Sequence, residues 1–252
     1  TPLAKLGEGM SVKTLQHALL DGKVDLIVHS LKDLPTEGID EITTIPVLRR
    51  ADPRDVLINR WNIPFRELPK SARIGTSSPR RAGQLKIERD DLRYLPIRGN
   101  IENRVAKASG SDYDGIVIAA AGVERLALES HIAEYLPVEL STPTPGQGAL
   151  AAEVRSGDTH LIDLINQLQE EETTLTVEAE RTVLRSAGSG CQIPIGALAV
   201  VIGDTLTLTA VCLSDDGNQV YSATLDWARN DPQGAGEAVY QILVNKGALG
   251  NR

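Results

Sequence analysis

The sequence predicts an α/β fold followed by a small, separate α+β domain. Two short apolar runs, residues 24–28 and 115–122, are rich in β-branched residues and have helical patterns beside them in the chain. This alternation is typical of buried strands in a largely parallel sheet. Towards the C-terminus the pattern changes to three alternating segments, 197–202, 206–213 and 219–227. These segments predict antiparallel strands with one solvent-exposed face.

The composition excludes several classes of protein. The chain has 252 residues and a formal net charge of -8, which argues against a general nucleic-acid binder because affinity for phosphates comes from excess Lys and Arg. An anionic ligand must therefore be bound by a local cluster of basic side chains. The two cysteines, Cys191 and Cys212, have no metal-ligand or disulfide spacing, which suits a reducing cytosol. The sequence has no membrane-spanning run and no signal peptide.

A polar turn after the first predicted strand is a candidate for function. The run at 24–28 is predicted to be a buried parallel strand, and Ser30, Lys32 and Asp33 follow its carboxyl end. Ligands bind beyond the carboxyl ends of strands in open α/β sheets. A surface ion pair between Lys32 and Asp33 is the structural alternative. His29 alone is more often a packed or hydrogen-bonded residue.

The strongest candidate for an anion site lies at the start of a predicted helix. Thr76, Ser77 and Ser78 form a hydroxyl-rich turn, in which Ser78 is a good N-cap and the proline after it suits the first helical position. Together with the free amides of this helix start, Arg80 and Arg81 make a site for a carboxylate or a phosphate. They could instead complement acidic surface, but two arginines at a helix start oppose the helix dipole unless an anion is bound.

Further arginines follow the next predicted strands. Arg98 comes directly after a short strand, and Asn100 can cap a helix that carries Arg104. These two arginines are candidates for a second carboxylate clamp, although Arg104 alone would usually be a solvated helix residue. The buried strand at 115–122 turns into a helix that carries Arg125.

Two irregular stretches connect the predicted parts of the chain. Residues 49–54 are predicted to be a linker, and residues 141–148 a loop. In that loop Gly146 and Gly148 allow the backbone to approach a ligand closely, or allow a crossing between domains. The loop is not a P-loop, because no Gly-Lys-Ser/Thr follows.

We assign residues 171–252 to the separate C-terminal domain. Its first helix, over 173–186, is expected to place its charged residues, Glu180 among them, on solvated turns. The glycine-rich stretch that follows is predicted to present Cys191 on an exposed turn, whereas a small buried hydrophobe is the alternative for a lone cysteine. Cys212 falls within a strand pattern and is predicted to be core.

Taken together, the motifs resemble the porphobilinogen deaminase family, also called hydroxymethylbilane synthase. The motifs are VHSLKDLPT at 28–36, GTSSPRR at 75–81, RGNI at 98–101, AAG at 120–122, PGQGAL at 145–150 and GCQIPIG at 190–196. The resemblance implies two lobes like those of periplasmic binding proteins, with mainly parallel sheets, and a small third domain. The implied domains are residues 1–48 with 149–170, residues 54–142, and residues 171–252, with crossings near 49–53 and 143–148.

The resemblance also implies the chemistry. Porphobilinogen would be deaminated, with release of ammonia, and polymerised into hydroxymethylbilane on a dipyrromethane cofactor, which Cys191 would hold through a thioether. Asp33 matches the catalytic carboxylate. The implied substrate-binding residues are Arg98, Arg104 and Gln147, and the implied cofactor-binding residues are Ser30, Lys32, Asp33, Thr76, Ser77, Ser78, Arg80, Arg81, Arg104, Arg125 and Gly148. The resemblance further implies a cytoplasmic monomer that binds neither nucleic acid nor membrane.

The chain departs from the family pattern at its amino terminus. It opens on Thr1 without an initiator Met, and we expect a leading segment, including the N-terminal part of the first domain, to be missing. Residues 7–12 resemble the family's mobile lid but are one residue short. Two alternatives stay open: a non-catalytic two-lobe module that binds an anionic small molecule, and a relative that has lost activity. Asp33 and Cys191 favour the enzyme, because reversible binding needs neither an acid nor a thiol.

Overall fold

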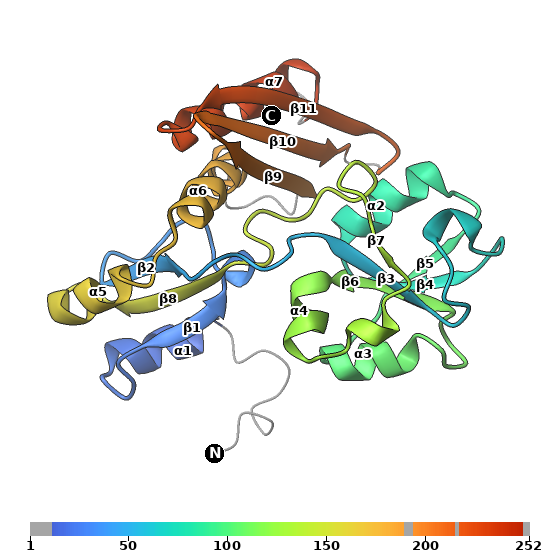
Figure 1. Ribbon diagram of the computed structural model, residues 1–252, viewed down its shortest axis with the longest axis horizontal. Coiled ribbons are helices and arrows are strands. Elements are labelled where there is room, and N and C mark those ends of the chain that lie inside the picture. Colours follow the sequence, from blue (N-terminus) through green and yellow to red (C-terminus); the bar gives the residue numbers. More distant parts are fainter. Residues whose placement is uncertain (1–11, 189–193, 215–216, 249–252) are drawn as a thin grey trace.

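Three separate sheets, each with its own helices, make up the protein (Figure 1). The structure is a computed structural model that describes residues 12–188, 194–214 and 217–248. The first lobe is blue and olive in Figure 1, the second lobe is teal and green, and the orange and red third domain lies above the place where the lobes meet. An α/β fold of two lobes with a small α+β C-terminal domain is therefore confirmed.

The first lobe is a three-stranded sheet with the order β1-β8-β2, in which both outer strands run antiparallel to β8. Its helix α1 packs Leu19 against Ile27 and Ile42, and α5 packs Ile165 against the other part of the core. The elements of this lobe are α1 (Val12–Leu20), β1 (Ile27–Ser30), the 3-10 helix η2 (Leu31–Asp33), β2 (Ile42–Val47), β8 (Leu150–Arg155) and α5 (Thr159–Asn166).

The prediction of a buried parallel strand at residues 24–28 is wrong in position and environment. Strand β1 begins only at Ile27 and pairs antiparallel with β8. Val24, Leu26 and Val28 are 37%, 41% and 56% exposed, and only Ile27 of this run is buried. The physical reason is that side chains of a strand point alternately to its two faces, and in this run only Ile27 packs on the core, with Leu19 and Ile42.

The second lobe is a five-stranded sheet with the order β5-β4-β6-β3-β7, buried on both faces. Successive residues of β3 alternate between two cores: Val56 and Ile58 enter one, and Leu57 enters the other. The strands are β3 (Asp55–Asn59), β4 (Arg73–Gly75), β5 (Arg93–Leu95), β6 (Gly115–Ala119) and β7 (Glu134–Tyr135). The helices are η3 (Phe65–Glu67), α2 (Pro79–Glu88), α3 (Ile101–Lys107), α4 (Ala120–Arg125) and η4 (Glu129–His131).

The prediction of mainly parallel sheets needs correction. In the second lobe β4 pairs parallel with β5 and β6, but β3 runs antiparallel to both β6 and β7. In the first lobe each described pair is antiparallel. Strands β3 and β8 are the strands that enter one lobe from the other, and they run against their neighbours. A periodicity signal shows that a strand is buried but carries no information on its direction.

The third domain is an antiparallel sheet with the order β11-β10-β9, covered by two helices. Val183 of the first helix and Val239 of the second pack on Leu208 in the centre of the sheet. Cys212 is 1% exposed, which confirms that it is core. The elements are α6 (Glu171–Ser186), β9 (Ile195–Ile202), β10 (Thr205–Leu213), β11 (Val220–Ala228) and α7 (Pro232–Asn245).

The expectation that Glu180 lies on a solvated turn is wrong. Its side chain is fully buried and accepts bonds from two Arg50 nitrogens at 2.6 and 2.9 Å. It also accepts bonds from the backbone N–H groups of Gly146 and Ala199, at 2.8 and 2.9 Å. One carboxylate of the third domain thus holds both segments that cross between the lobes.

The two crossing segments approach each other closely, as the glycines of residues 141–148 predict. Ala51 donates a backbone hydrogen bond to the Gly148 carbonyl at 3.2 Å. Gly148 has φ +88°, and a Cβ there would lie 2.5 Å from the Ala51 oxygen, so that only glycine fits.

Among the helices that the structure describes, none is long and apolar enough to cross a membrane.

Candidate functional site

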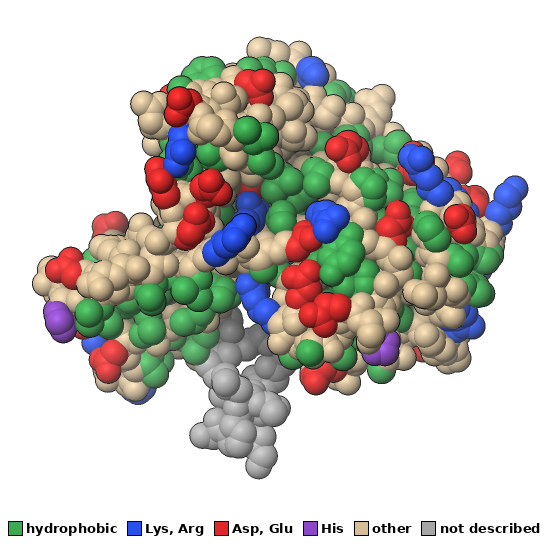
Figure 2. All heavy atoms as spheres, viewed as in Figure 1, with side chains coloured by type: hydrophobic (Ala, Val, Ile, Leu, Met, Phe, Trp, Pro, Cys, Tyr) green, Lys and Arg blue, Asp and Glu red, His purple; other side chains and the backbone are tan. Residues whose placement is uncertain are grey.

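Half of the predicted functional residues line one cavity where the two lobes meet. The cavity has a volume of about 200 Å³. The predicted residues in its wall are Ser30, Lys32, Asp33, Arg81, Arg104, Arg125 and Gly148. They come from the end of β1, from η2, from the start of α2, from α3, from the end of α4 and from the second crossing segment. Figure 2 shows Lys and Arg side chains gathered around the junction of the lobes.

The short helix η2 aims Lys32 and Asp33 at this cavity. Leu31 and Leu34, on either side of them, are 1% and 5% exposed and anchor the turn in the core. Leu31 also donates a backbone hydrogen bond to the Ala149 carbonyl at 3.0 Å. Because both flanking leucines point into the core of the lobe, the side chains of Lys32 and Asp33 point away from that core and towards the cavity. The strand was misplaced from sequence, but the prediction that Lys32 and Asp33 follow its carboxyl end is confirmed.

The turn that carries Asp33 is also held from the third domain. Arg181 of α6 donates to the carbonyl oxygens of Leu31 and Leu34, each at 3.2 Å, and to that of Pro35 at 2.6 Å. Burial lowers the pKa of Arg181 from its ordinary value, and Arg185 adds repulsion. The helix that leads into the stretch containing Cys191 therefore contacts the turn that contains Asp33.

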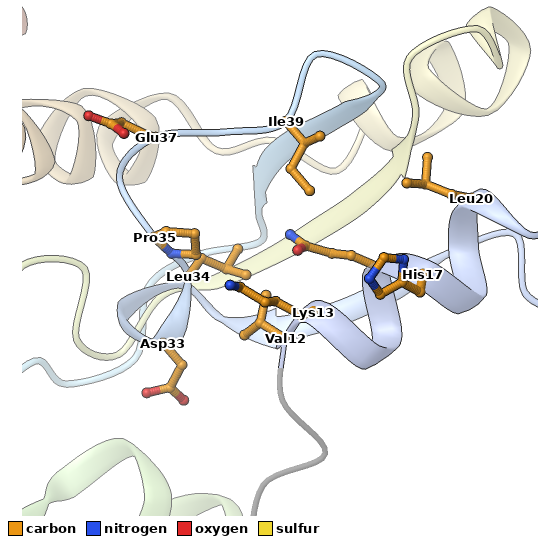
Figure 3. A pocket seen from close by; sticks show the side chains of 10 residues that line it. Val12, Lys13, His17, Leu20, Asp33, Leu34, Pro35, Glu37 and Ile39 are labelled. Carbon is orange, nitrogen blue, oxygen red and sulfur yellow. The ribbon is translucent and has the colours of Figure 1, made fainter. Parts of the chain in front are cut away.

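A second and larger hollow lies on the other side of Asp33, between α1 and residues 33–39 (Figure 3). It has a volume of about 690 Å³, and its wall includes Val12, Leu20 and Ile39. In Figure 3 the Asp33 carboxylate points away from these apolar side chains. Size alone would favour this hollow, but the cationic side chains converge on the smaller cavity.

The start of α2 has the local structure that its sequence predicts. Ser78 caps the helix by accepting a bond from the Arg81 N–H at 3.4 Å, and Pro79 occupies the first turn. Ser77 donates to the Ile97 carbonyl at 2.6 Å and accepts from the Ile97 N–H at 2.9 Å. These bonds tie the turn to the segment after β5. Thr76, Ser77 and Ser78 themselves lie outside the wall of the cavity.

The anion that Arg80 and Arg81 need is present within the protein. Asp55, the first residue of β3, is fully buried. Its carboxylate lies 2.8 Å from Nη2 of Arg80 and 2.9 Å from Nε of Arg81. Burial pushes the pKa of Asp55 upwards, but attraction by Arg81 and Arg80 outweighs it, so that the pKa lies well below its usual range. The dipole argument from sequence assigned this anion to a bound ligand and did not identify the internal partner Asp55.

The two arginines differ in what they face. Arg80 is 4% exposed, and it donates to the Thr142 carbonyl and, at 3.5 Å, to the Ser141 hydroxyl. Arg81 forms part of the cavity wall, whereas Arg80 does not. Only one of the two predicted anion-binding arginines therefore reaches the cavity in this structure.

Lys32 is held at the cavity by Gln147. The Lys32 ammonium donates to Oε1 of Gln147 at 3.2 Å, and Gln147 is fully buried. Burial and the repulsion of Arg81 lower the pKa of Lys32 to about 8, against the attraction of Asp33 and Asp55. Lys32 is therefore a largely buried lysine held by Gln147, and not one half of a surface ion pair with Asp33, which was the structural alternative.

Two other predicted arginines line the cavity from the second lobe. Arg104 donates through Nε to the Gly99 carbonyl at 2.6 Å, and Arg125 donates through Nη2 to the Gly148 carbonyl at 2.8 Å. Each guanidinium has five N–H groups, and among the described residues one carbonyl accepts from each guanidinium, so that other N–H groups can meet a ligand. Arg98 is exposed and lies outside the wall of the cavity.

Two predictions fall on residues whose structure is not described. Cys191 lies between the described segments 12–188 and 194–214, and residues 7–11 of the predicted lid precede the first described residue. Their places in the site stay predictions. Sequence reasoning missed the buried carboxylates of Asp55 and Glu180, and Arg50 as the partner of Glu180. The signal available for Asp55 was a carboxylate that opens a continuous apolar strand, shortly after a run of arginines.

Comparison with known proteins identifies the family. The family described as "Porphobilinogen deaminase, dipyromethane cofactor binding domain" matches residues 1–163, and the family described as "Porphobilinogen deaminase, C-terminal domain" matches residues 174–244. The chain belongs to the porphobilinogen deaminase family. It therefore has porphobilinogen deaminase activity, with a dipyrromethane cofactor domain, and acts in tetrapyrrole biosynthesis. The alternatives of a binding module and of a relative without activity are set aside.

Individual relatives agree with this assignment. The porphobilinogen deaminase of Syntrophomonas wolfei is 41% identical over 97% of this chain and 80% of its own length. That of Geobacter metallireducens is 42% identical over 98% of this chain and 78% of its own length. The enzyme of Corynebacterium glutamicum is 40% identical over 100% of this chain and 85% of its own length.

Solved structures give a weaker likeness. The periplasmic aliphatic sulphonate binding protein SsuA from Escherichia coli is 15% identical, with a TM-score of 0.40, over 69% of this chain and 57% of its own. A lipoprotein of the YaeC family from Enterococcus faecalis is 14% identical, with a TM-score of 0.35, over 71% of this chain and 74% of its own. At TM-scores this low the likeness adds nothing to what the strand order already shows.

Proposed function

We propose that the cavity between the lobes is the catalytic cleft of this deaminase, with Asp33 as its catalytic carboxylate and porphobilinogen as its substrate. One observation carries the proposal: Lys32, Arg81, Arg104 and Arg125 surround the same cavity as Asp33. A chain with a net charge of -8 has gathered these cations at one place. Such a cluster matches the acetate and propionate arms of porphobilinogen and of every pyrrole derived from it.

The cations would hold the carboxylates of the substrate and of the cofactor. Arg104 and Arg125 each have N–H groups left over from their backbone contacts, which suits the donor set that a dipyrromethane with carboxylate arms requires. The proposed cofactor-binding residues also include Ser30 and Gly148, which lie in the wall of the cavity. Four others form the turn and helix start that hold Arg81 in place: Thr76, Ser77, Ser78 and Arg80. The proposed substrate-binding residues are Arg104, which lines the cavity, and Arg98 and Gln147, which lie outside its described wall.

Asp33 would act on the reacting end of the substrate. Its side chain is exposed and borders the cavity, so that a carboxylate oxygen is free to accept a hydrogen bond from a pyrrole N–H. As ammonia leaves porphobilinogen, positive charge develops on the pyrrole nitrogen, and a fixed carboxylate nearby stabilises it. The same oxygen can hold the proton that moves as the new bond forms.

Cys191 is the proposed attachment point of the cofactor. When bound, dipyrromethane supplies the terminal pyrrole to which substrate units are added. Cys212, the cysteine that the structure describes, is buried in the core of the third domain, which leaves Cys191 as the thiol for attachment. The contact of α6 with the Asp33 turn through Arg181 supports a third domain that serves this cavity.

The proposed domains are residues 1–48 with 149–170, residues 54–142 and residues 171–252. From the family resemblance we also propose a monomer that works in the cytoplasm. Size-exclusion chromatography with light scattering tests the monomer. A dimer that stays intact on dilution would contradict it.

The variant Asp33→Asn tests the proposed function. The amide keeps the shape of the side chain but cannot hold the negative charge, and we expect kcat for hydroxymethylbilane formation to fall by about 100-fold or more. Asp40→Asn is the matched control, because Asp40 is an exposed carboxylate on the loop that follows the same turn, and it should keep wild-type turnover. Wild-type turnover by folded Asp33→Asn would remove Asp33 from the reaction.

A further inference from the structure

The carboxylate of Asp55 binds donors from the second lobe and from the second crossing segment. Oδ2 accepts from Arg80 and from the Ser141 hydroxyl, each at 2.8 Å. Oδ1 accepts from Nε of Arg81 at 2.9 Å and from Nε2 of Gln147 at 2.8 Å. An ionised carboxylate has about four acceptor sites, and these four donors occupy them. Asp55 is therefore a saturated, buried anchor.

This anchor fixes which edge of Arg81 faces the cavity. Nε and Nη2 of Arg81 lie 2.9 and 2.7 Å from Oδ1 of Asp55, and Nη2 also donates to Gln147 at 3.2 Å. The edge that carries Nε and Nη2 is thus occupied by protein, and the remaining Nη1 group belongs to a side chain in the cavity wall. A guanidinium is planar and rigid, so that holding one edge orients the other.

The same anchor orients Gln147, and through it Lys32. Nε2 of Gln147 donates to Asp55 and, at 2.7 Å, to the Pro53 carbonyl. With its amide nitrogen held by these acceptors, Gln147 presents Oε1 to the cations Lys32 and Arg81, each at 3.2 Å. Asp55 is therefore connected to the ammonium of Lys32 by hydrogen bonds through the side chain of Gln147. Asp55 itself lies outside the wall of the cavity.

We propose that Asp55 is a positioning residue of the deaminase reaction, whose buried carboxylate places Arg81 and Lys32 so that both meet the carboxylates of porphobilinogen and of the cofactor. The inference rests on the proposed function of the cavity and deepens it. A simple charge argument predicts the opposite of positioning: removing a carboxylate from a cationic site should tighten the binding of an anionic substrate. The direction of the change in KM therefore separates the two.

Lys32 supplies a second readout. The charged groups that face it are Asp33 on η2, Arg80 and Arg81 on α2, Asp55 at the start of β3, and Arg104 and Arg125 across the cavity. The negative charge of Asp55 favours the ammonium form, so that its removal lowers the pKa of Lys32 below about 8. The alkaline limb of kcat/KM should then move to lower pH, which a merely structural role of Asp55 would not cause.

The test compares Asp55→Asn with Asp114→Asn in the holoenzyme. Asp114 is the matched control, because it also lies in the second lobe and pairs with two arginines, Arg73 at 2.9 Å and Arg60 at 3.5 Å, away from the cavity. We expect KM for porphobilinogen to rise about tenfold in Asp55→Asn, as loss of a charge-assisted hydrogen bond predicts, and the alkaline limb to move to lower pH. Asp114→Asn should show neither change.

Three further variants decide the remaining outcomes. Asp55→Glu keeps the charge and should return the alkaline limb towards that of the wild type. If Asp55→Asn does not fold, Gln147→Met replaces it, because this variant removes the Lys32 acceptor and should move the limb in the same direction. Asp33→Asn is measured in parallel: wild-type turnover there overturns the proposed function itself. An unchanged or lower KM in Asp55→Asn overturns the role of Asp55 alone, and so does an unchanged alkaline limb in Asp55→Asn or in Gln147→Met.

Discussion

Lys32 is the residue whose ionisation should be visible in kinetics. Burial lowers its pKa to about 8, and its neighbours Arg81 and Asp33 act in opposite directions. The ammonium exists below that pKa and is lost as pH rises through it. A carboxylate held by Lys32 is therefore held at neutral pH and released on the alkaline side.

We predict that KM for porphobilinogen rises as pH increases from about 7 to about 9, and that Lys32→Arg flattens this rise. The guanidinium of arginine does not titrate in this range. Steady-state kinetics of both proteins across the range make the comparison. An alkaline rise of the same size in Lys32→Arg would assign the titration to another group.

Prediction at the residue scale succeeded where a residue's role depends on its immediate neighbours in the chain. Ser78 was predicted as an N-cap from its residue type and from the proline after it, and it caps α2. Asp55 was missed because its partners Arg80 and Arg81 are 25 and 26 positions away along the chain. A sequence shows that two arginines need an anion, but only the fold shows that the protein itself provides one.

At the scale of elements, the start of α2 joins stability to function. Its cap Ser78 accepts a hydrogen bond from the backbone N–H of Arg81, the arginine that lines the cavity. A frayed first turn would move that arginine. The cap of α5, Asp158, accepts a comparable bond from Leu161 at 3.1 Å in the first lobe and lies outside the wall of the cavity.

We predict that Ser78→Ala lowers the free energy of unfolding by about 1 kcal/mol and also raises KM. Asp158→Ala should lower the free energy of unfolding by a similar amount and leave KM unchanged. Urea unfolding gives the first quantity, and steady-state kinetics give the second. A change in KM of equal size in both variants would mean that general destabilisation, and not the position of Arg81, causes it.

Elements were predicted well where the spacing of apolar residues was regular. They were predicted poorly where packing and strand pairing with distant segments determine the bounds or the direction of the element. The helical pattern beside the run at 24–28 coincides with α1 (Val12–Leu20), because its apolar spacing is complete within the segment. The strand predicted at 24–28 is displaced to Ile27–Ser30, because an apolar run does not show which of its residues meets a neighbouring strand. Strand direction in the two lobes was likewise decided by chain crossings that no local pattern encodes.

At the scale of the whole molecule, Glu180 joins all three bodies. It binds Arg50 of the first crossing segment, Gly146 of the second and Ala199 of its own domain. The Arg50 pair is almost wholly buried, with side-chain exposures of 10% and 0%. Breaking one partner of a buried pair leaves the other charge uncompensated, which costs far more than the loss of a surface pair.

We predict that Glu180→Gln lowers the free energy of unfolding by roughly 3 kcal/mol. Glu178→Gln is the control on the same helix: Glu178 is 41% exposed and pairs with Arg185 at 3.1 Å, so that its loss should cost less than about 1 kcal/mol. Chemical unfolding of the three proteins measures the difference. Equal costs in the two variants would show that Glu180 does not join the domains energetically.

The three bodies thus have separate tasks that meet at one cavity. The first lobe contributes Lys32 and Asp33, and the second contributes Arg81, Arg104 and Arg125. The third domain contacts the Asp33 turn through Arg181 and, in our account, carries the cofactor on Cys191. This division explains why an acidic protein concentrates positive charge where its lobes meet.

The intact mass of the purified enzyme, compared with that of Cys191→Ser, tests this account most directly. We predict that the wild type carries the added mass of two linked pyrrole units and that Cys191→Ser carries none. Acid-induced unfolding before the measurement distinguishes a covalent thioether from a tightly bound ligand. An unmodified wild type, or the same added mass in Cys191→Ser, would contradict the assignment of Cys191 as the residue that presents the cofactor to the cavity.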